Sequence, residues 1–130
     1  MKAIAQEHPL SCGLACVASA ANRAYRQVFK LANQKDAWTR GYYCPDLVSL
    51  LKKMKMRYAY APYSLKTRKY LQKKGTIVFI TSKKMPYGHY LLRTPKGWMN
   101  SWINFPRITP AKAGFTKKLP GKPKWVIYPV

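Results

Sequence analysis

The sequence predicts an α+β protein in which N-terminal helices pack on an antiparallel sheet. The first half of its 130 residues contains small-residue and Leu-rich segments with helical spacing, whereas the second half contains β-branched and aromatic segments typical of strands. No internal repeat or break in composition divides the chain. We therefore expect a single domain over residues 1–130, a length that can bury one ordinary core.

Three helices are expected in the first half. A run of small apolar residues predicts a helix from Cys12 to about Arg23, and apolar positions in residues 25–33 predict a shorter second one. Pro45 and Asp46 are typical of a helix start, and the residues that follow have one apolar face. That face is expected to consist of Leu47, Leu50, Leu51 and Met54.

The strands are expected mainly in the second half. Residues 57–61 alternate as a strand does, and Ser64 is expected to cap a short helix that ends at Leu71. Further strands are expected over residues 76–80, 89–93, 98–102 and 125–128, with 89–93 and 98–102 joined as a hairpin by the Pro/Gly turn at 94–97.

The chain is strongly basic, with 25 Lys and Arg against 3 Asp and Glu and a net charge of +22. Most cations therefore lack an acidic partner within the chain, which predicts a positive surface that attracts polyanions. The 10 Tyr and 4 Trp residues add rings that can stack on bases. A solvated surface that serves solubility is the alternative. The candidate polyanion-binding residues are Lys52, Lys53, Lys66, Arg68, Lys69, Lys73 and Lys74.

Composition also sets expectations for the compartment. No apolar run approaches the roughly 20 residues needed to cross a bilayer, and no signal peptide is expected at the N-terminus. The odd number of cysteines, 3, argues against a disulfide framework and for a reducing compartment. We therefore expect a soluble protein in the cytoplasm, either its own cell's or that of a target cell into which it is delivered, with Cys16 and Cys44 as packing residues.

The segment that begins at Gln6 predicts a nucleophilic cysteine. Cys12 lies at the start of the first expected helix, where unpaired N–H groups and the helix dipole favour a thiolate. Gly13 leaves room for a substrate, and the amide of Gln6 can donate to a developing oxyanion. The alternative interpretation is an ordinary buried thiol at Cys12.

A cysteine nucleophile requires a base, and the chain has 2 histidines. His89 is favoured over His8 because Gly88 permits close approach and because the cysteine and histidine of such sites come from separate parts of a fold. Asn100, on the other strand of the expected hairpin, would orient the His89 ring. Neither a cofactor nor a metal is expected. A zinc set of Cys12, Cys16, His8 and His89 would lack a paired Cys-x-x-Cys.

These motifs resemble those of the papain-like, double-glycine leader peptidases of the bacteriocin-processing type. The resemblance runs from Gln6 through Cys-Gly-Leu-Ala-Cys at 12–16, a Leu-rich helix and Gly-Thr-Ile-Val-Phe at 75–79 to His-Tyr-Leu-Leu at 89–92. It implies a papain-like cysteine peptidase fold with Cys12 as nucleophile and His89 as general base. It also implies that Gln6 is the oxyanion-hole donor and that Asn100 orients the histidine, although the family usually has Asp-Pro at the position of Asn100-Ser101.

We therefore expect a cysteine-dependent hydrolase that acts on a peptide or protein by acyl transfer. The alternative is a basic nucleic-acid-binding or RNA-cleaving toxin or phage factor on the same scaffold, with a nucleic acid or another acidic partner bound by the positive surface. A third interpretation is an inactive peptide-binding module that retains the groove.

Overall fold

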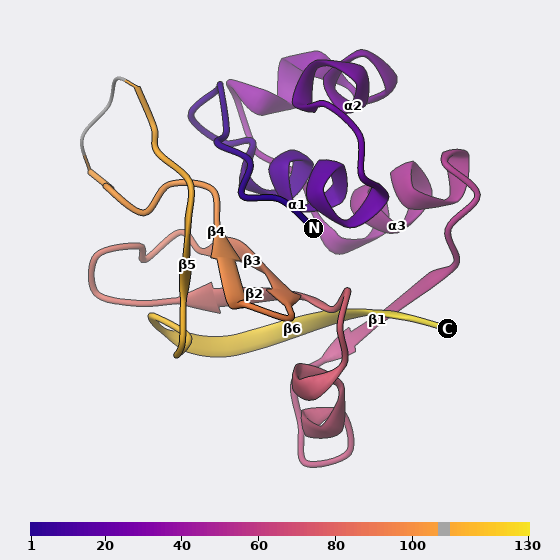
Figure 1. Cartoon of the computed structure of the whole chain (residues 1–130), viewed down its shortest axis with the longest axis vertical. Helices are drawn as coiled ribbons and strands as arrows, with labels where there is room; N and C mark the ends of the chain where they lie inside the picture. The colour runs from indigo at the N-terminus through magenta and orange to yellow at the C-terminus, as the bar shows by residue number, and fades with distance from the viewer. Residues whose placement is uncertain (107–109) are drawn as a thin grey trace.

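Helices cover one face of a single antiparallel sheet (Figure 1). The structure, a computed structural model, describes residues 1–106 and 110–130. Within them the helical layer contains α1 (Cys12–Ala21), α2 (Tyr25–Leu31) and α3 (Cys44–Lys53), with the short 3-10 helix η1 (Gln34–Ala37) between α2 and α3. This arrangement confirms the predicted α+β class and the placement of helices before the sheet.

The described residues form a sheet of six strands in the order β1-β6-β2-β3-β4-β5, and all neighbouring strands are antiparallel. The C-terminal strand β6 inserts between β1 and β2, so it is an internal strand of the sheet. The strand bounds are β1 (Tyr58–Pro62), β2 (Ile77–Thr81), β3 (His89–Thr94), β4 (Gly97–Asn100), β5 (Gly114–Thr116) and β6 (Lys122–Pro129).

The helix boundaries follow local chemistry. The Tyr43 N–H donates to the Asp46 carboxylate at 2.8 Å, which satisfies an otherwise unpaired group at the start of α3. Asn22 ends α1 in the left-handed conformation, with φ 55°. The helices therefore differ from the predicted ranges by one or two residues at their ends. The apolar face predicted for α3 points to the core, where Leu47, Leu50 and Leu51 are buried.

The sheet separates two cores. The larger one lies between the sheet and the helices, and the smaller one lies on the outer face of the sheet. Because β2 contributes side chains to both cores, nearly every position along it is apolar, instead of every second one. The outer core comprises Val78, Ile80, Leu91, Trp98 and Val126, covered by Tyr63, Leu71, Leu119 and Tyr128.

The short helix predicted from Ser64 begins later than expected. Residues 65–67 form a turn, and the 3-10 helix η2 (Arg68–Gln72) follows. The Ser64 N–H donates to Thr67 Oγ1 at 2.8 Å, while the Thr67 and Arg68 N–H groups donate to the Ser64 carbonyl. The hydroxyl of Thr67 thus stabilises a turn where the first residues of the helix were expected.

The second strand of the predicted hairpin ends earlier than expected. β4 stops at Asn100, whose Oδ1 accepts the Trp102 N–H at 2.9 Å in a local turn that leads the chain out of the sheet. Sequence analysis missed the three-residue strand β5, which pairs with β4. No helix in residues 1–106 or 110–130 has the length and apolar character needed to span a membrane.

Candidate active site

Cys12 lies at the first turn of α1 and is a half-buried residue. The remainder of α1 is almost entirely buried and packs against β3, so the position of the sulfur is set by the core. The Tyr90 N–H donates to Cys12 Sγ at 3.4 Å, and the His89 ring and the Gly13 N–H lie near enough to the sulfur to lower the pKa of its thiol. The fold therefore brings the predicted nucleophile and the predicted base close together, although they are far apart in sequence.

The surroundings of Cys12 and His89 favour a thiolate–imidazolium pair. Burial acts to raise the pKa of the Cys12 thiol, but the charge and hydrogen bond of His89, together with two backbone N–H groups, lower that pKa below its ordinary value. Burial acts to lower the pKa of His89, but the Cys12 thiolate and the Asn100 side chain raise it. The two shifts favour the same charge-separated state, which is the reactive form of such a cysteine.

Asn100 fixes the orientation of the His89 ring. His89 Nε2 lies 2.7 Å from Asn100 Oδ1, and both side chains are buried. Because Oδ1 also accepts the Trp102 N–H, the oxygen rather than the amide nitrogen must face the ring. Nε2 must then carry a proton, which leaves Nδ1 for the sulfur of Cys12. The structure thus brings the three predicted residues together in the order sulfur, imidazole, amide.

Gln6 lies at the same cleft but has other partners. Its Nε2 donates to the carbonyls of His8 and Pro9 at 3.0 and 3.1 Å, and its Oε1 accepts the Ser101 hydroxyl at 2.8 Å. The Gln6 side chain therefore braces the turn before Cys12 against the end of β4. An oxyanion would have to share its amide N–H groups with these carbonyls, and the role of oxyanion donor stays a prediction.

His8 is unsuited to be the base because its ring has other neighbours. It stacks on Phe29 with centroids 4.3 Å apart and meets the edge of Trp38 at 4.9 Å. Its Nδ1 lies 2.8 Å from the Tyr25 hydroxyl. This aromatic cluster, which the sequence analysis missed, packs α2 against the segment before Cys12.

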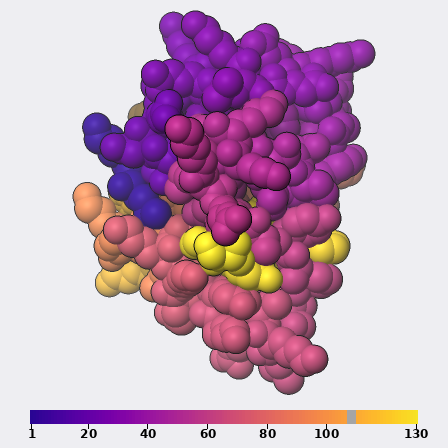
Figure 2. Space-filling view, turned by 90° about the vertical axis from the view of Figure 1, so that its right-hand side faces the viewer, coloured from indigo at the N-terminus to yellow at the C-terminus, as the bar shows by residue number. Residues whose placement is uncertain are grey.

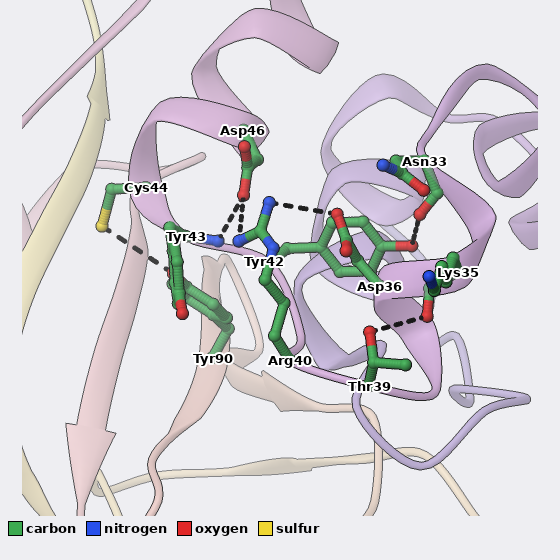
Figure 3. Close-up of polar contacts among 10 residues, drawn as sticks. All are labelled: Asn33, Lys35, Asp36, Thr39, Arg40, Tyr42, Tyr43, Cys44, Asp46 and Tyr90. Atoms are coloured by element: carbon green, nitrogen blue, oxygen red, sulfur yellow. Dashed lines mark hydrogen bonds and ion pairs between the residues drawn. The ribbon is translucent and has the colours of Figure 1, made fainter.

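The other two cysteines are buried, in agreement with their predicted packing role. Burial raises the pKa of both the Cys16 and the Cys44 thiol, and a charge on Cys12 raises that of Cys16 further. Cys44 Sγ lies 3.8 Å from the Tyr90 hydroxyl (Figure 3). Cys12 is therefore the one cysteine whose surroundings lower its pKa.

We expect iodoacetamide to modify Cys12 faster than Cys16 or Cys44. Because the Cys12 pKa is lowered, its rate should reach a plateau at a lower pH than that of an ordinary thiol. Peptide mass spectrometry after timed labelling over a pH series would measure all three rates. Equal rates in the folded protein would contradict a nucleophilic role for Cys12.

The sulfur opens into a cleft of about 900 Å³ between the helices and the sheet. Cys12, His89 and Gln6 line it, and no Asp or Glu is found among its described lining residues. Aromatic side chains dominate the walls, and several of them are exposed. These rings are Tyr42, Tyr43, Tyr60, Phe79, Tyr87, Tyr90, Trp102, Phe105 and Trp125.

One wall of the cleft is held by an ionic cluster that sequence reasoning missed. Arg40 contacts the carboxylates of Asp36 at 3.0 Å and Asp46 at 3.1 Å, and its guanidinium lies 4.4 Å from the centre of the Tyr43 ring (Figure 3). Figure 3 shows that Arg40, in the segment after η1, joins Asp36 of η1 to Asp46 at the start of α3. The sequence did contain an indication of this cluster, because Asp36 and Asp46 are two of only 3 acidic residues and lie on either side of Arg40.

The predicted polyanion-binding residues lie outside the cleft and are all exposed. Lys52 and Lys53 end α3, and the others lie in or beside η2. Among the described residues, no group of His, Cys, Asp and Glu is arranged to hold a metal ion. The chain matches no protein-family model, and no curated protein matches it.

Proposed function

We propose that the protein is a cysteine-dependent hydrolase that cleaves a peptide bond by acyl transfer. The observation that supports this most directly is the position of the His89 ring, which lowers the pKa of Cys12 on one side and lies 2.7 Å from Asn100 Oδ1, through Nε2, on the other. A nucleophile, a base and a group that orients the base are the parts this chemistry requires. The resemblance to papain-like leader peptidases supports the same conclusion.

In the acylation step, the Cys12 thiolate attacks the substrate carbonyl. A carbon–sulfur bond forms as negative charge moves onto the carbonyl oxygen. The Cys12 N–H, which has no intrahelical acceptor at the first turn of α1, can donate to this oxyanion, and Gln6 is the second proposed donor. The His89 imidazolium then protonates the leaving amine as the carbon–nitrogen bond breaks.

In the deacylation step, neutral His89 removes a proton from a water molecule that attacks the thioester. The carbon–sulfur bond breaks, the carboxylic acid leaves and the thiolate–imidazolium pair is restored. Asn100 does not touch the reacting atoms. It keeps His89 Nδ1 directed at the sulfur in both steps, and as a neutral amide it does so without adding charge.

The cleft supports a peptide or protein as the substrate class. Its volume of about 900 Å³ accommodates several residues of extended chain, and its aromatic walls suit apolar side chains. The glycines beside Cys12 and His89 serve packing instead of substrate access, contrary to the expectation for Gly13. Leu47 and Tyr90 fill the space that a Cβ of Gly13 would occupy, and the Phe79 ring does so at Gly88.

The proposal is tested by covalent capture with a peptidyl acyloxymethyl ketone, which alkylates an active thiolate. We expect a single adduct on Cys12 by intact mass and peptide mapping. Cys12→Ala should abolish the adduct and any hydrolysis of a fluorogenic peptide library, and Cys16→Ala, which changes a buried thiol of the same helix, should retain both. Labelling that survives Cys12→Ala would exclude Cys12 as the nucleophile. A folded protein that is not captured and hydrolyses no peptide would refute the enzymatic proposal.

A further inference from the structure

We propose that the segment formed by residues 63–75, here called the basic lobe, binds the phosphate backbone of a nucleic acid, with the start of β6 extending the surface. The basic lobe connects β1 to β2 and includes η2. In Figure 1 the basic lobe is the pink coil that projects from the sheet on the side opposite the helices. Figure 2 shows it in pink at the end of the molecule farthest from the helical layer.

The charges of the molecule are segregated between its two layers. The 3 acidic residues all belong to the helical layer or the segment before it, and each has a cationic partner there. The pairs are Arg26–Glu7 at 3.7 Å, Arg40–Asp36 at 3.0 Å and Arg40–Asp46 at 3.1 Å. Residues 47–130 contain no Asp or Glu. The cations of the basic lobe therefore have no side-chain carboxylate to neutralise them.

The basic lobe concentrates this uncompensated charge. Its cations are all exposed, and their mutual repulsion is relieved most effectively by a partner with repeated negative charges. A phosphodiester chain provides one charge per nucleotide, and binding releases its condensed counterions. The cations are Lys66, Arg68, Lys69, Lys73 and Lys74.

The basic lobe is anchored to the sheet. Tyr70 stacks on Tyr128 of β6 with ring centroids 3.9 Å apart and planes 2° from parallel. Leu71 packs on the outer core, and Lys73 Nζ donates to the Pro129 carbonyl at 3.0 Å. These contacts hold the cations in a defined arrangement, which lowers the entropy lost when they bind a partner.

The positive surface continues onto the neighbouring strand. Lys122 and Lys124 are exposed at the start of β6, and the Tyr63 N–H donates to the Lys124 carbonyl at 2.9 Å. The basic lobe thus meets β6 near both ends of the strand, since Tyr63 bonds to Lys124 and Tyr70 stacks on Tyr128. Cations along a track beside aromatic rings are the combination with which proteins hold single-stranded nucleic acid.

An anionic membrane is a weaker fit to the same charges. Peripheral membrane binding combines cations with several apolar side chains that enter the interface. In the basic lobe, Leu65 is the one large hydrophobic residue that is exposed, at 89 %. The basic lobe also contributes no residue to the described lining of the cleft, so nucleic acid binding is independent of the thiol chemistry.

The test measures binding of fluorescein-labelled oligouridylate to the full chain between about 50 and 200 mM salt. The lobe variant carries Lys66→Glu, Arg68→Glu, Lys69→Glu, Lys73→Glu and Lys74→Glu. The matched control carries Lys2→Glu, Arg23→Glu, Arg26→Glu, Lys30→Glu and Lys35→Glu, which changes the net charge equally but on exposed residues of the helical half. We expect the lobe variant to bind at least about tenfold more weakly and its salt slope to fall by about 0.7 for each phosphate that it no longer neutralises.

A variant with fewer substitutions separates weaker binding from a folding defect. It keeps Lys73, which donates to the Pro129 carbonyl, and Lys69, which lies over the Tyr70 ring. Lys66→Glu, Arg68→Glu and Lys74→Glu change exposed side chains, and together they should reproduce part of the decrease in affinity. Equal weakening by the lobe variant and the matched control would overturn the proposal, because total charge alone would then explain binding. Binding to phosphatidylserine vesicles without binding to oligouridylate would also overturn it.

Discussion

Replacing His89 with alanine is expected to reduce peptide hydrolysis by about 10²- to 10⁴-fold, the usual contribution of a positioned acid–base group. The substitution removes the proton donor for the leaving amine. It also removes the cation that lowers the Cys12 pKa, so desolvation would dominate and the thiol pKa would rise. The measurements are kcat/KM and the pH profile of Cys12 alkylation, whose rise should move to higher pH.

The pH dependence of hydrolysis follows from the directions in which the pKa values of Cys12 and His89 are shifted. The lowered pKa of Cys12 sets the acidic limb of kcat/KM, and the raised pKa of His89 sets the alkaline limb, so activity should peak between them. Asn100→Asp keeps the acceptor for His89 but adds a negative charge, which should move the alkaline limb to higher pH. His89→Ala protein that stays folded yet keeps the wild-type alkylation profile would show that His89 does not activate Cys12.

Much of this site was predictable from sequence because its parts obey short-range rules. The cysteine belongs to a helix start, and the histidine and asparagine belong to one hairpin whose turn is marked by Pro95 and Gly97. In the observed register Asn100 pairs with Leu91, two residues along β3 from His89, and so faces the same side of the sheet. Hairpin register is local information, and this is why the contact between His89 and Asn100 could be anticipated.

The features that sequence analysis missed depend on contacts between distant segments. Gln6 meets Ser101 only because the N-terminal segment packs against the end of β4, and nothing near either residue encodes that meeting. The insertion of β6 between β1 and β2 is likewise a property of the whole sheet. β5 is three residues long and contains Gly114, so it carries neither the length nor the side-chain pattern of a strand.

Substituting Gly88 with alanine is expected to destabilise the protein and to slow the reactions of Cys12. Gly88 has φ 94°, which L-residues adopt at a cost of about 1–2 kcal/mol. An added Cβ would also lie 1.8 Å from Cζ of Phe79, so the ring must move. The Phe79 ring packs against the Tyr90 ring with centroids 4.8 Å apart, and the Tyr90 N–H donates to the Cys12 sulfur. The disturbance therefore affects both His89, which follows Gly88, and Cys12, which Tyr90 contacts.

Gly75→Ala provides the matched control for Gly88→Ala. Gly75 has the same φ of 94°, but the nearest atom to an added Cβ would be the Tyr58 hydroxyl oxygen, at 3.0 Å. Gly75 is not among the described residues that line the cleft. Chemical denaturation should show the backbone cost in both variants and a larger decrease in stability for Gly88→Ala, whereas alkylation of Cys12 should slow in Gly88→Ala alone. Adding Phe79→Leu to Gly88→Ala should recover part of the rate, because it removes the overlap and leaves the backbone strain. If both glycine variants alkylate at the wild-type rate, the packing of Phe79 on Gly88 does not position His89 against Cys12.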